Sequence, residues 1–349
     1  MNIYEQQQAN RKRTWLIVAI FIVFFAFLGL GFDHFYLGYA PWAPPPQPYE
    51  YEPVDGVRLI GINSSAAFPF ATIFAILFSS GWAWWGLLYG DRAVLSSSQA
   101  MKIEPSMEGD KYRQLVNVVH EMSIASGLPM PKVYIIFDPD PNAFATGRDP
   151  QHASIAVTQG LLDKLNREEL QGVIAHEMSH VRNLDIRLMT TIAALVGAVA
   201  LLSDWAMRGM RSGGGRSRSS SKKGGGGGNI ILFVIWLALV ILAPIIAQIL
   251  AMAVSREREY LADASGAELT RNPGGLLAAL KKIESDSSPT KTIQRGTAHL
   301  CIADPLGSKM GLREGFMADL LATHPPMWKR INALKQMAYQ ASPASPAGQ

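Results

Sequence analysis

The residues whose chemistry is easiest to assign lie between Asn166 and Asp185. This stretch contains His176, Glu177 and His180 in the order H-E-x-x-H. Side chains four residues apart share one face of a helix, so both imidazoles can bind the same metal ion. Glu177 then lies beside the metal, where it can take a proton from water. Catalytic zinc prefers two such histidines, a third protein ligand and one open position.

The same stretch has the sequence pattern of a helix. Asn166, followed three residues later by Glu169, forms a capping-box start, and apolar residues then recur at helical spacing. A chance match on an ordinary amphipathic helix is the alternative interpretation. The chain has only seven histidines in 349 residues, so two of them at this spacing around a glutamate favour a metal site.

A third ligand is expected further along the chain, between Ser255 and Glu268. Glu259 and Asp263 are four residues apart and therefore share a helix face. A carboxylate from a second helix would complete a His-His-Glu site, and an aspartate one turn away could orient a ligating imidazole. Glu257 is a competing choice for the ligand. A solvated acidic helix face is the alternative interpretation of this stretch.

The composition indicates a membrane protein. Hydrophobic residues make up 48% of the chain, and the mean hydropathy is positive. The net charge of +4 is concentrated in a few clusters, which bears on membrane orientation and gives no reason to expect a nucleic-acid partner. The single cysteine, Cys301, excludes an intrachain disulfide and a multi-cysteine zinc site.

Two uncharged runs, 14–32 and 59–90, are long enough to cross a bilayer. Arg11, Lys12 and Arg13 precede the first run and few basic residues follow it, which places the N-terminus in the cytoplasm. A cleaved signal peptide is the alternative for the first run, but no small-x-small cleavage site closes it. The second crossing would return residue 91 and onward to the cytoplasm.

Two later apolar runs leave the topology open. They flank a Gly/Ser/Arg-rich connector at 208–229, which is expected to be flexible. If both runs span the membrane, the basic connector lies outside, against the positive-inside tendency. A re-entrant hairpin would fit the charges, whereas two full spans fit the lengths better, and we favour two spans. In either case the third ligand and His176 must lie on the same side.

The region between the membrane runs and the H-E-x-x-H motif is predicted to be a soluble α/β part. Residues 109–127 have a helical pattern, and 132–137 and 154–158 have strand patterns. The stretch Asn142 to Thr146 lies in a loop rich in Pro, Asp and Gly. It is the best candidate for an exposed sheet edge that could bind substrate backbone as an added strand. A plain surface hairpin is the alternative.

Four motifs together resemble one family. HEMSH followed by Asn183 and Asp185, then SREREYLADASGA, NAFATG and THPPMWKRI, are similar to segments of the HtpX-like membrane zinc metallopeptidases, relatives of the CaaX prenyl endopeptidases. The resemblance extends from the first apolar run to about residue 335. It implies that Glu259 is the third zinc ligand, and that Asp263 and Asn183 support the ligands.

The resemblance also implies roles outside the metal ligands. Asn142, Ala143, Phe144 and Ala145 would form a substrate-binding edge strand. His324, in the His-Pro-Pro motif, would lie near the active site, where it could donate a hydrogen bond to the developing oxyanion; a structural role is the alternative. The Pro-rich first loop and the long connector depart from the family pattern.

We therefore expect an α+β fold, a zincin-like metallopeptidase domain combined with transmembrane helices. The chain would be a multi-pass protein of the cell (inner or plasma) membrane with its catalytic domain in the cytoplasm. It would bind one Zn²⁺, with Glu177 as the base, and cleave polypeptides, chiefly misfolded or damaged membrane proteins, in quality control. The alternatives are a processing peptidase for a defined or lipidated peptide and a non-catalytic zinc-bound scaffold.

The expected division of the chain follows from these assignments. Its segments are a cytoplasmic N-terminus (1–13), a transmembrane helix (14–32), a Pro-rich extracytoplasmic loop (33–58), a transmembrane helix (59–90), the first catalytic part (91–187), a transmembrane or re-entrant helix (188–207), the connector (208–229), a transmembrane helix (230–254), the second catalytic part (255–340) and a disordered tail (341–349).

Overall fold

The chain forms two compact units in the computed structural model. It describes residues 3–37, 39, 48–50, 60–62, 68–212, 234–238, 256–286, 292–293, 297–303 and 325–341. One unit, here called the catalytic unit, consists of Met1–Leu16, Ala83–Met207 and Pro244–Gln349. The other, here called the hairpin unit, consists of Ile17–Trp82 and Arg208–Ala243. Both long N-terminal helices, α1 (Ile3–Tyr36) and α2 (Phe70–Ser97), contribute residues to each unit.

The hairpin unit is built on a close pairing of α1 with α2. Asp33 accepts hydrogen bonds from the backbone N–H groups of Ala71 (2.9 Å) and Thr72 (2.7 Å) and thereby caps the start of α2. Gly29 lies so close that a Cβ there would be 2.7 Å from the Ala71 carbonyl oxygen. The sequence between α1 and α2 contains two short strands, β1 (Pro48–Glu50) and β2 (Ile60–Ile62). These strands pair antiparallel.

Two helices are long and apolar enough to cross a membrane, Tyr4–Tyr36 and Phe70–Ser97. Large apolar side chains are exposed on both of them, for example Phe27 and Phe74. The run 14–32 lies within the first of these helices. The second begins at Phe70 rather than at residue 59 and continues past residue 90 to Ser97, because 60–62 pair in β2 and Pro69 stands just before the helix.

The catalytic unit contains a four-stranded mixed sheet in the order β3-β4-β6-β5. Its central strands, β4 (Lys132–Ile136) and β6 (Ser154–Thr158), are parallel, whereas β3 (Met101–Lys102) and β5 (Ala143–Thr146) pair antiparallel to their neighbours. The two predicted strands are confirmed, and the Asn142–Thr146 stretch forms the edge strand β5.

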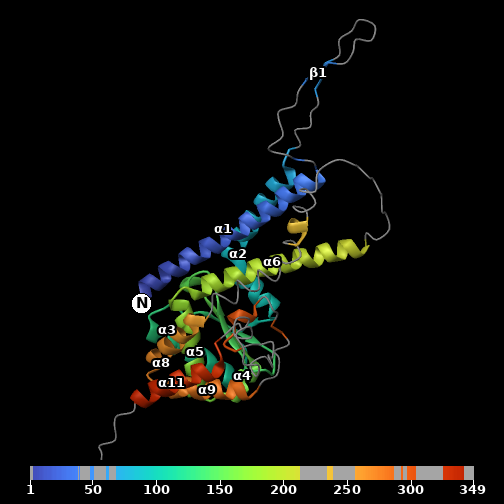
Figure 1. The fold of residues 1–349 in the computed structure, drawn as a ribbon. Helices are drawn as coiled ribbons and strands as arrows, with labels where there is room; N and C mark the ends of the chain where they lie inside the picture. Colours follow the sequence, from blue (N-terminus) through green and yellow to red (C-terminus); the bar gives the residue numbers. More distant parts are fainter. Residues whose placement is uncertain are drawn as a thin grey trace, which may run out of the picture. The chain divides into compact units, whose positions relative to one another are not determined.

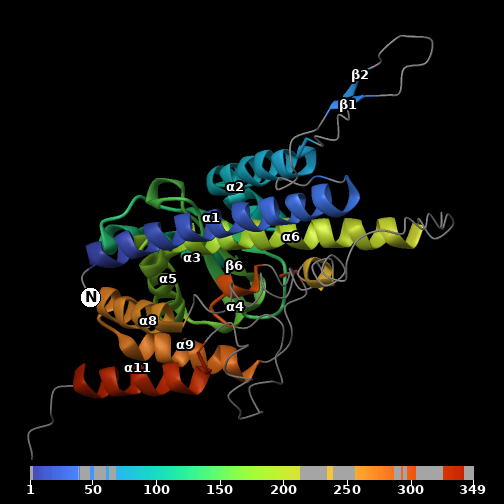
Figure 2. The ribbon, with the colours of Figure 1, turned by 45° about the horizontal axis from the view of Figure 1, so that its top comes forward.

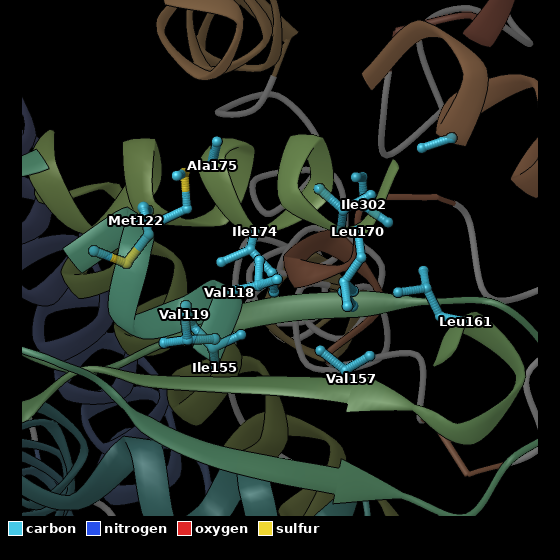
Figure 3. Close-up of a cluster of buried hydrophobic side chains, with 14 of the residues drawn as sticks. Val118, Val119, Met122, Ile155, Val157, Leu161, Leu170, Ile174, Ala175 and Ile302 are labelled. Carbon is cyan, nitrogen blue, oxygen red and sulfur yellow. The ribbon is translucent and has the colours of Figure 1, made fainter. Parts of the chain in front are cut away.

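Helices cover this sheet and enclose its core. Figures 1 and 2 show α8, α9 and α11 together on one side of α5. Helix α5 packs against α3, α8, α9 and β5, and α11 packs against α9 and α8. Buried apolar side chains of α3, β6 and α5, among them Val118, Ile155 and Ile174, fill the space between sheet and helices (Figure 3). The helices are α3 (Asp110–Ser126), α4 (Gln159–Lys164), α5 (Arg167–Arg182), α6 (Asp185–Ser212), α8 (Arg256–Thr270), α9 (Pro273–Ser285), α11 (Met327–Ala341) and the 3₁₀ turns η1 (Pro150–His152) and η2 (Ala298–Leu300).

Glycine ends α3 as the sequence predicts. Gly109 precedes the helix, and Gly127 follows it in the left-handed conformation, with φ of 68°. Leu115, Val118, Val119 and Met122, which lie on one face of this helix, are all buried. The predicted helix at 109–127 is thus confirmed.

The turn from α5 to α6 bends the chain by 83° between Arg167–Arg182 and Asp185–Ala200. Leu184 adopts a positive φ of 59° at this turn. The first half of α6 is covered by protein: Gly86 and Gly90 of α2 lie against Ala194 and Thr190. Among the described residues, α6 is long and apolar enough to cross a membrane only if it is taken together with α5 as one bent pair of helices.

The later membrane segments are described only in part. The predicted segment 188–207 lies within α6, which continues to Ser212, so the first residues of the predicted connector are helical. Of the run 230–254, only 234–238 belong to the described residues. Most of the connector, most of the Pro-rich loop and nearly all of the predicted tail lie outside the described residues.

Candidate metal centre

Helix α5 carries the H-E-x-x-H motif into the interior of the catalytic unit. Its start is fixed by a capping box: Asn166 accepts from the N–H of Glu169, and the Glu169 carboxylate accepts from the N–H of Asn166, both at 2.9 Å. The capping prediction is confirmed. His176, Glu177 and His180 are all buried.

Helix α8 brings Glu259 to the two histidines. It approaches α5 closely at Gly266, where a Cβ would lie 3.0 Å from the backbone nitrogen of His176. The Nε2 atoms of His176 and His180 are 3.3 Å apart, and they lie 3.6 Å and 3.5 Å from the carboxylate oxygens of Glu259. One potential ligand atom from each residue lies within 4.8 Å of the others.

These distances fit one tetrahedral zinc ion. Zinc binds imidazole nitrogen and carboxylate oxygen at about 2.0–2.2 Å, which puts neighbouring ligand atoms of a tetrahedron about 3.3–3.6 Å apart. The 3.3 Å between the two Nε2 atoms falls in that interval, and each Nε2 lies at such a distance from one oxygen of Glu259, His176 from Oε2 and His180 from Oε1. The donor set of two imidazoles and one carboxylate is also that of a catalytic zinc site with one position open. The residues present therefore fit the metal.

Asp263 contacts the imidazole nitrogen of His176 that does not face the metal position, and Arg330 holds Asp263 in place. Nδ1 of His176 is 2.9 Å from Oδ1 of Asp263, although its N–H is not well aligned with that oxygen. Arg330, from α11, is fully buried and donates to both oxygens of Asp263 at 2.8 Å and 2.7 Å. Its Nη1 also lies 3.4 Å from Glu259. One guanidinium thus contacts the carboxylates of both Asp263 and Glu259.

Burial and pairing shift the pKa values of this group in opposite directions. Burial alone would raise the pKa of Asp263, but the Arg330 guanidinium outweighs it and holds that pKa at about 2. Burial alone would lower the pKa of His176, but hydrogen bonds to Asp263 and Glu259 outweigh it and raise that pKa to about 9 in the metal-free site. The carboxylates that favour a proton on His176 would also favour a metal cation bound beside it.

His180 is supported by Asp185, the first residue of α6. Its Nδ1 is 3.1 Å from Oδ2 of Asp185. Oδ1 of the same carboxylate accepts a 2.7 Å hydrogen bond from Nδ2 of Asn10, in the first turns of α1. The resemblance implied a supporting role for Asn183, which instead ends α5 and uses its carbonyl to accept from Asn10 at 3.0 Å. The side chain that contacts the imidazole belongs to Asp185.

Glu177 lies between the metal ligands and β5. Within the described residues, neither of its buried carboxylate oxygens has a hydrogen-bond partner. Burial raises the pKa of Glu177 above its ordinary value, and this effect exceeds the lowering by His176 and His180. A buried carboxylate with free lone pairs and a raised pKa is suited to accept a proton and give it up again.

The predicted substrate-binding strand lies at the edge of the sheet, facing α5. Asn142 is buried just before β5, and all four residues of β5 are buried as well. The edge of β5 is buried because residues 297–303, which follow α9 in the sequence, lie along it. Ile302 donates its backbone N–H to the Ala143 carbonyl at 2.9 Å.

Two predicted site residues are not placed by the structure. His324 lies outside the described residues, so its proposed oxyanion role stays a prediction. Glu257, the competing third ligand, lies in α8, with its side chain outside the described part. Three contributors were not identified from the sequence: Asn10, Asp185 as the partner of His180, and Arg330 as the partner of Asp263. Asp185 and Arg330 are charged residues next to the recognised motifs, which is a signal in the sequence, whereas Asn10 is neutral and lies far from the motifs.

Known proteins agree with this geometry. The model of "Peptidase family M48" matches residues 110–338. A protease HtpX homolog of Caldanaerobacter subterraneus subsp. tengcongensis is 42% identical over 335 residues, covering 96% of this chain and 98% of the relative. A protease HtpX homolog of Tropheryma whipplei is 45% identical over 268 residues, covering 77% and 86%.

A solved structure is more distant. The crystal structure of S. mikatae Ste24p aligns with a TM-score of 0.44 and 17% identity, covering 76% of this chain and 58% of that one. The sequence relatives carry the assignment, because they cover 96% and 77% of the chain at over 40% identity. The α+β fold and the resemblance to HtpX-like enzymes are thus confirmed. The chain belongs to peptidase family M48, the metal-dependent peptidases that include the HtpX membrane proteases.

Proposed function

We propose that this chain is a zinc endopeptidase that cleaves membrane proteins at the cytoplasmic surface of the cell membrane. The observation that supports the zinc assignment is that the Nε2 atoms of His176 and His180 are 3.3 Å apart and lie 3.6 Å and 3.5 Å from the two carboxylate oxygens of Glu259. This spacing suits one tetrahedral zinc ion. Glu177 stands next to the ligands with unpaired oxygens.

Zinc, when bound, supplies a Lewis acid that polarises the scissile carbonyl and acidifies a water molecule. Glu177 takes the proton from the attacking water and passes it to the leaving amine. Asp263 and Asp185 keep the imidazoles of His176 and His180 in the tautomer whose Nε2 faces the metal. No covalent bond between enzyme and substrate is needed for this reaction.

The attachment of the catalytic unit to the long N-terminal helices supports membrane proteins as substrates. The first turns of α1 and the last turns of α2 belong to the catalytic unit itself, and both helices are apolar enough to span a bilayer. The site is therefore held next to the membrane. The basic residues Arg11, Lys12 and Arg13 at the start of the apolar part of α1 support a cytoplasmic N-terminus. Removal of damaged membrane proteins, a stress response, fits this placement.

The test is the zinc content and proteolytic activity of the detergent-purified protein. Glu177→Gln should keep the zinc and lose casein cleavage, because it removes only the proton acceptor. Glu259→Ala should lose both, and Glu257→Ala should retain both. Full zinc in Glu259→Ala would refute the ligand assignment. A Glu177→Gln variant that still cleaves would refute the role of Glu177 as the proton acceptor, and a zinc-loaded wild-type protein that cleaves nothing would favour a narrow processing peptidase or a scaffold.

A further inference from the structure

The outer edge of β5 is covered by a segment of the chain itself, residues 300–303, here called the edge segment. The Ile302 N–H donates to the Ala143 carbonyl at 2.9 Å, and Cys301 forms an antiparallel bridge with Phe144. The edge segment thus pairs with the outer edge of β5 through one isolated antiparallel bridge and one backbone hydrogen bond. An extended peptide bound by strand addition makes the same kind of contact.

Two buried side chains complete the recognition of this backbone. The Asn142 amide donates from Nδ2 to the Ala303 carbonyl at 3.2 Å, while its Oδ1 lies 3.5 Å from the Ala303 nitrogen. Arg330 donates from Nη1 to the Ile302 carbonyl at 2.8 Å. All of these bonds reach backbone groups, so the same donors and acceptors can hold an extended peptide of any sequence.

This backbone-binding edge adjoins the metal centre. The guanidinium of Arg330 that binds the Ile302 carbonyl also lies 3.4 Å from Glu259. Strand β5 also packs against α5, the helix that carries His176, Glu177 and His180. A peptide that followed the course of the edge segment would therefore pass the metal ligands and the proton acceptor.

The side chain of Ile302 fills an apolar position beside α5. It is buried in the same cluster as Leu170 and Ala175 of that helix (Figure 3). Upstream of the segment, His299 is fixed by a hydrogen bond to the Met189 carbonyl at 3.1 Å. The edge segment therefore begins directly after His299. It can leave the edge of β5 while the hydrogen bond of His299 to Met189 stays in place.

We propose that the edge segment is an internal occupant of the substrate groove, which a substrate displaces, and that its contacts reveal how a substrate binds. Ala143, Asn142 and Arg330 then bind substrate backbone, and the substrate residue that replaces Ile302 is aliphatic. Each hydrogen bond to the edge segment is exchanged for one to the substrate, so displacement does not leave these groups unpaired. The proposal rests on the proposed peptidase function.

The chain carries its own reporter for this displacement. Cys301 is its only cysteine and is 1% exposed. The experiment measures the rate of Cys301 alkylation by a maleimide in zinc-loaded Glu177→Gln, which cannot consume the probe. The probe is a short unstructured peptide with one central isoleucine, and its binding is followed separately by fluorescence anisotropy. A peptide with aspartate in place of the isoleucine is the matched control.

A saturating isoleucine peptide should accelerate alkylation at least about tenfold, because a protected thiol becomes accessible. The aspartate peptide should bind weakly and leave the rate unchanged. If the isoleucine peptide binds while Cys301 stays protected, the edge segment is a fixed part of the sheet and the proposal is wrong. If no peptide binds and the wild-type protein cleaves none, the proposed function itself fails.

A variant of the edge segment gives an independent measurement. Ile302→Pro removes the N–H that bonds Ala143, whereas Ile302→Val retains it with nearly the same side chain. Ile302→Pro should lower KM with kcat unchanged and speed Cys301 alkylation without peptide; Ile302→Val should match the wild type. Faster alkylation with an unchanged KM would show that the edge segment does not compete with substrate.

Discussion

Asn10 lies far from the metal motif in sequence, yet the structure predicts that it controls zinc affinity. Its Nδ2 donates to Asp185 at 2.7 Å and to the Asn183 carbonyl at 3.0 Å, and its side chain is buried. The other oxygen of Asp185 is the one that faces Nδ1 of His180. Asn10 therefore fixes the rotation of the carboxylate that orients a ligand.

The loss of zinc affinity caused by Asn10→Ala has an upper limit, which is the loss expected when Asp185 itself is replaced. Loss of the direct partner, as in Asp185→Asn, should weaken zinc binding about 10–100-fold. A hydrogen bond to a charged group contributes about 1.5–3 kcal/mol, and only part of this reaches the metal through Asp185. For Asn10→Ala we expect zinc binding about 3–10-fold weaker, or about 0.7–1.4 kcal/mol.

The assay is competition for zinc between the purified protein and a chromophoric chelator. Gln7→Ala is the matched control, because Gln7 donates to the Arg182 carbonyl at 2.7 Å from the same turns of α1. Both variants should lose stability, but only Asn10→Ala should lose zinc affinity. Equal zinc affinity in the two variants, or tighter binding in Asn10→Ala, would refute the reasoning.

Three further predictions concern stability. In the metal-free protein, the pKa of His176 is raised from 6.5 to about 9, so its contribution is complete below pH 6.5 and is lost as the pH rises through 9. Thermal unfolding should then show a loss of about 3 kcal/mol over this range; a flat profile, or a matching loss in the zinc-loaded protein, would contradict it. Gly172→Ala should destabilise the catalytic unit by about 1–3 kcal/mol, because the new Cβ would lie 2.6 Å from the Leu276 nitrogen. Gly197→Ala, in open space, is the control and should not lower the melting temperature. Asp33→Ala should cost about 0.5–2 kcal/mol in chemical denaturation by removing the cap of α2, with zinc content unchanged; lost zinc would show that the two units are not independent.

Local sequence patterns predicted the elements that carry the chemistry. The capping box at Asn166 and the glycines around α3 mark helix ends through bonds between close neighbours, so a single sequence contains the whole signal. The start of α2 was placed too early because apolar composition continues from residue 59, while pairing of 60–62 with 48–50 depends on a distant segment. Hydropathy gives the length of an apolar run, but it does not show whether part of that run pairs as a strand with a distant segment.

The support of the metal ligands could not be predicted in the same way. Asn10 and Asp185 are 175 residues apart, and Arg330 and Asp263 are 67 residues apart. Each pairing depends on how helices pack, and no spacing rule connects these positions. Gly266 shows the same limit: it is an ordinary helical glycine in the sequence, and only the packing of α8 on α5 reveals why a side chain would not fit there.

The charges buried at the site explain why the metal belongs to this fold. Around the metal centre, four carboxylates and two guanidiniums are at most 5% exposed, so with all six groups ionised two negative charges remain that a divalent cation would balance. Without the cation, the carboxylates of Asp263 and Glu259 outweigh burial and raise the pKa of His176, which favours its protonated form. Zinc and this proton therefore compete for the same negative environment, so zinc affinity should rise with pH until His176 is neutral. The six groups are Glu177, Asp185, Glu259, Asp263, Arg258 and Arg330.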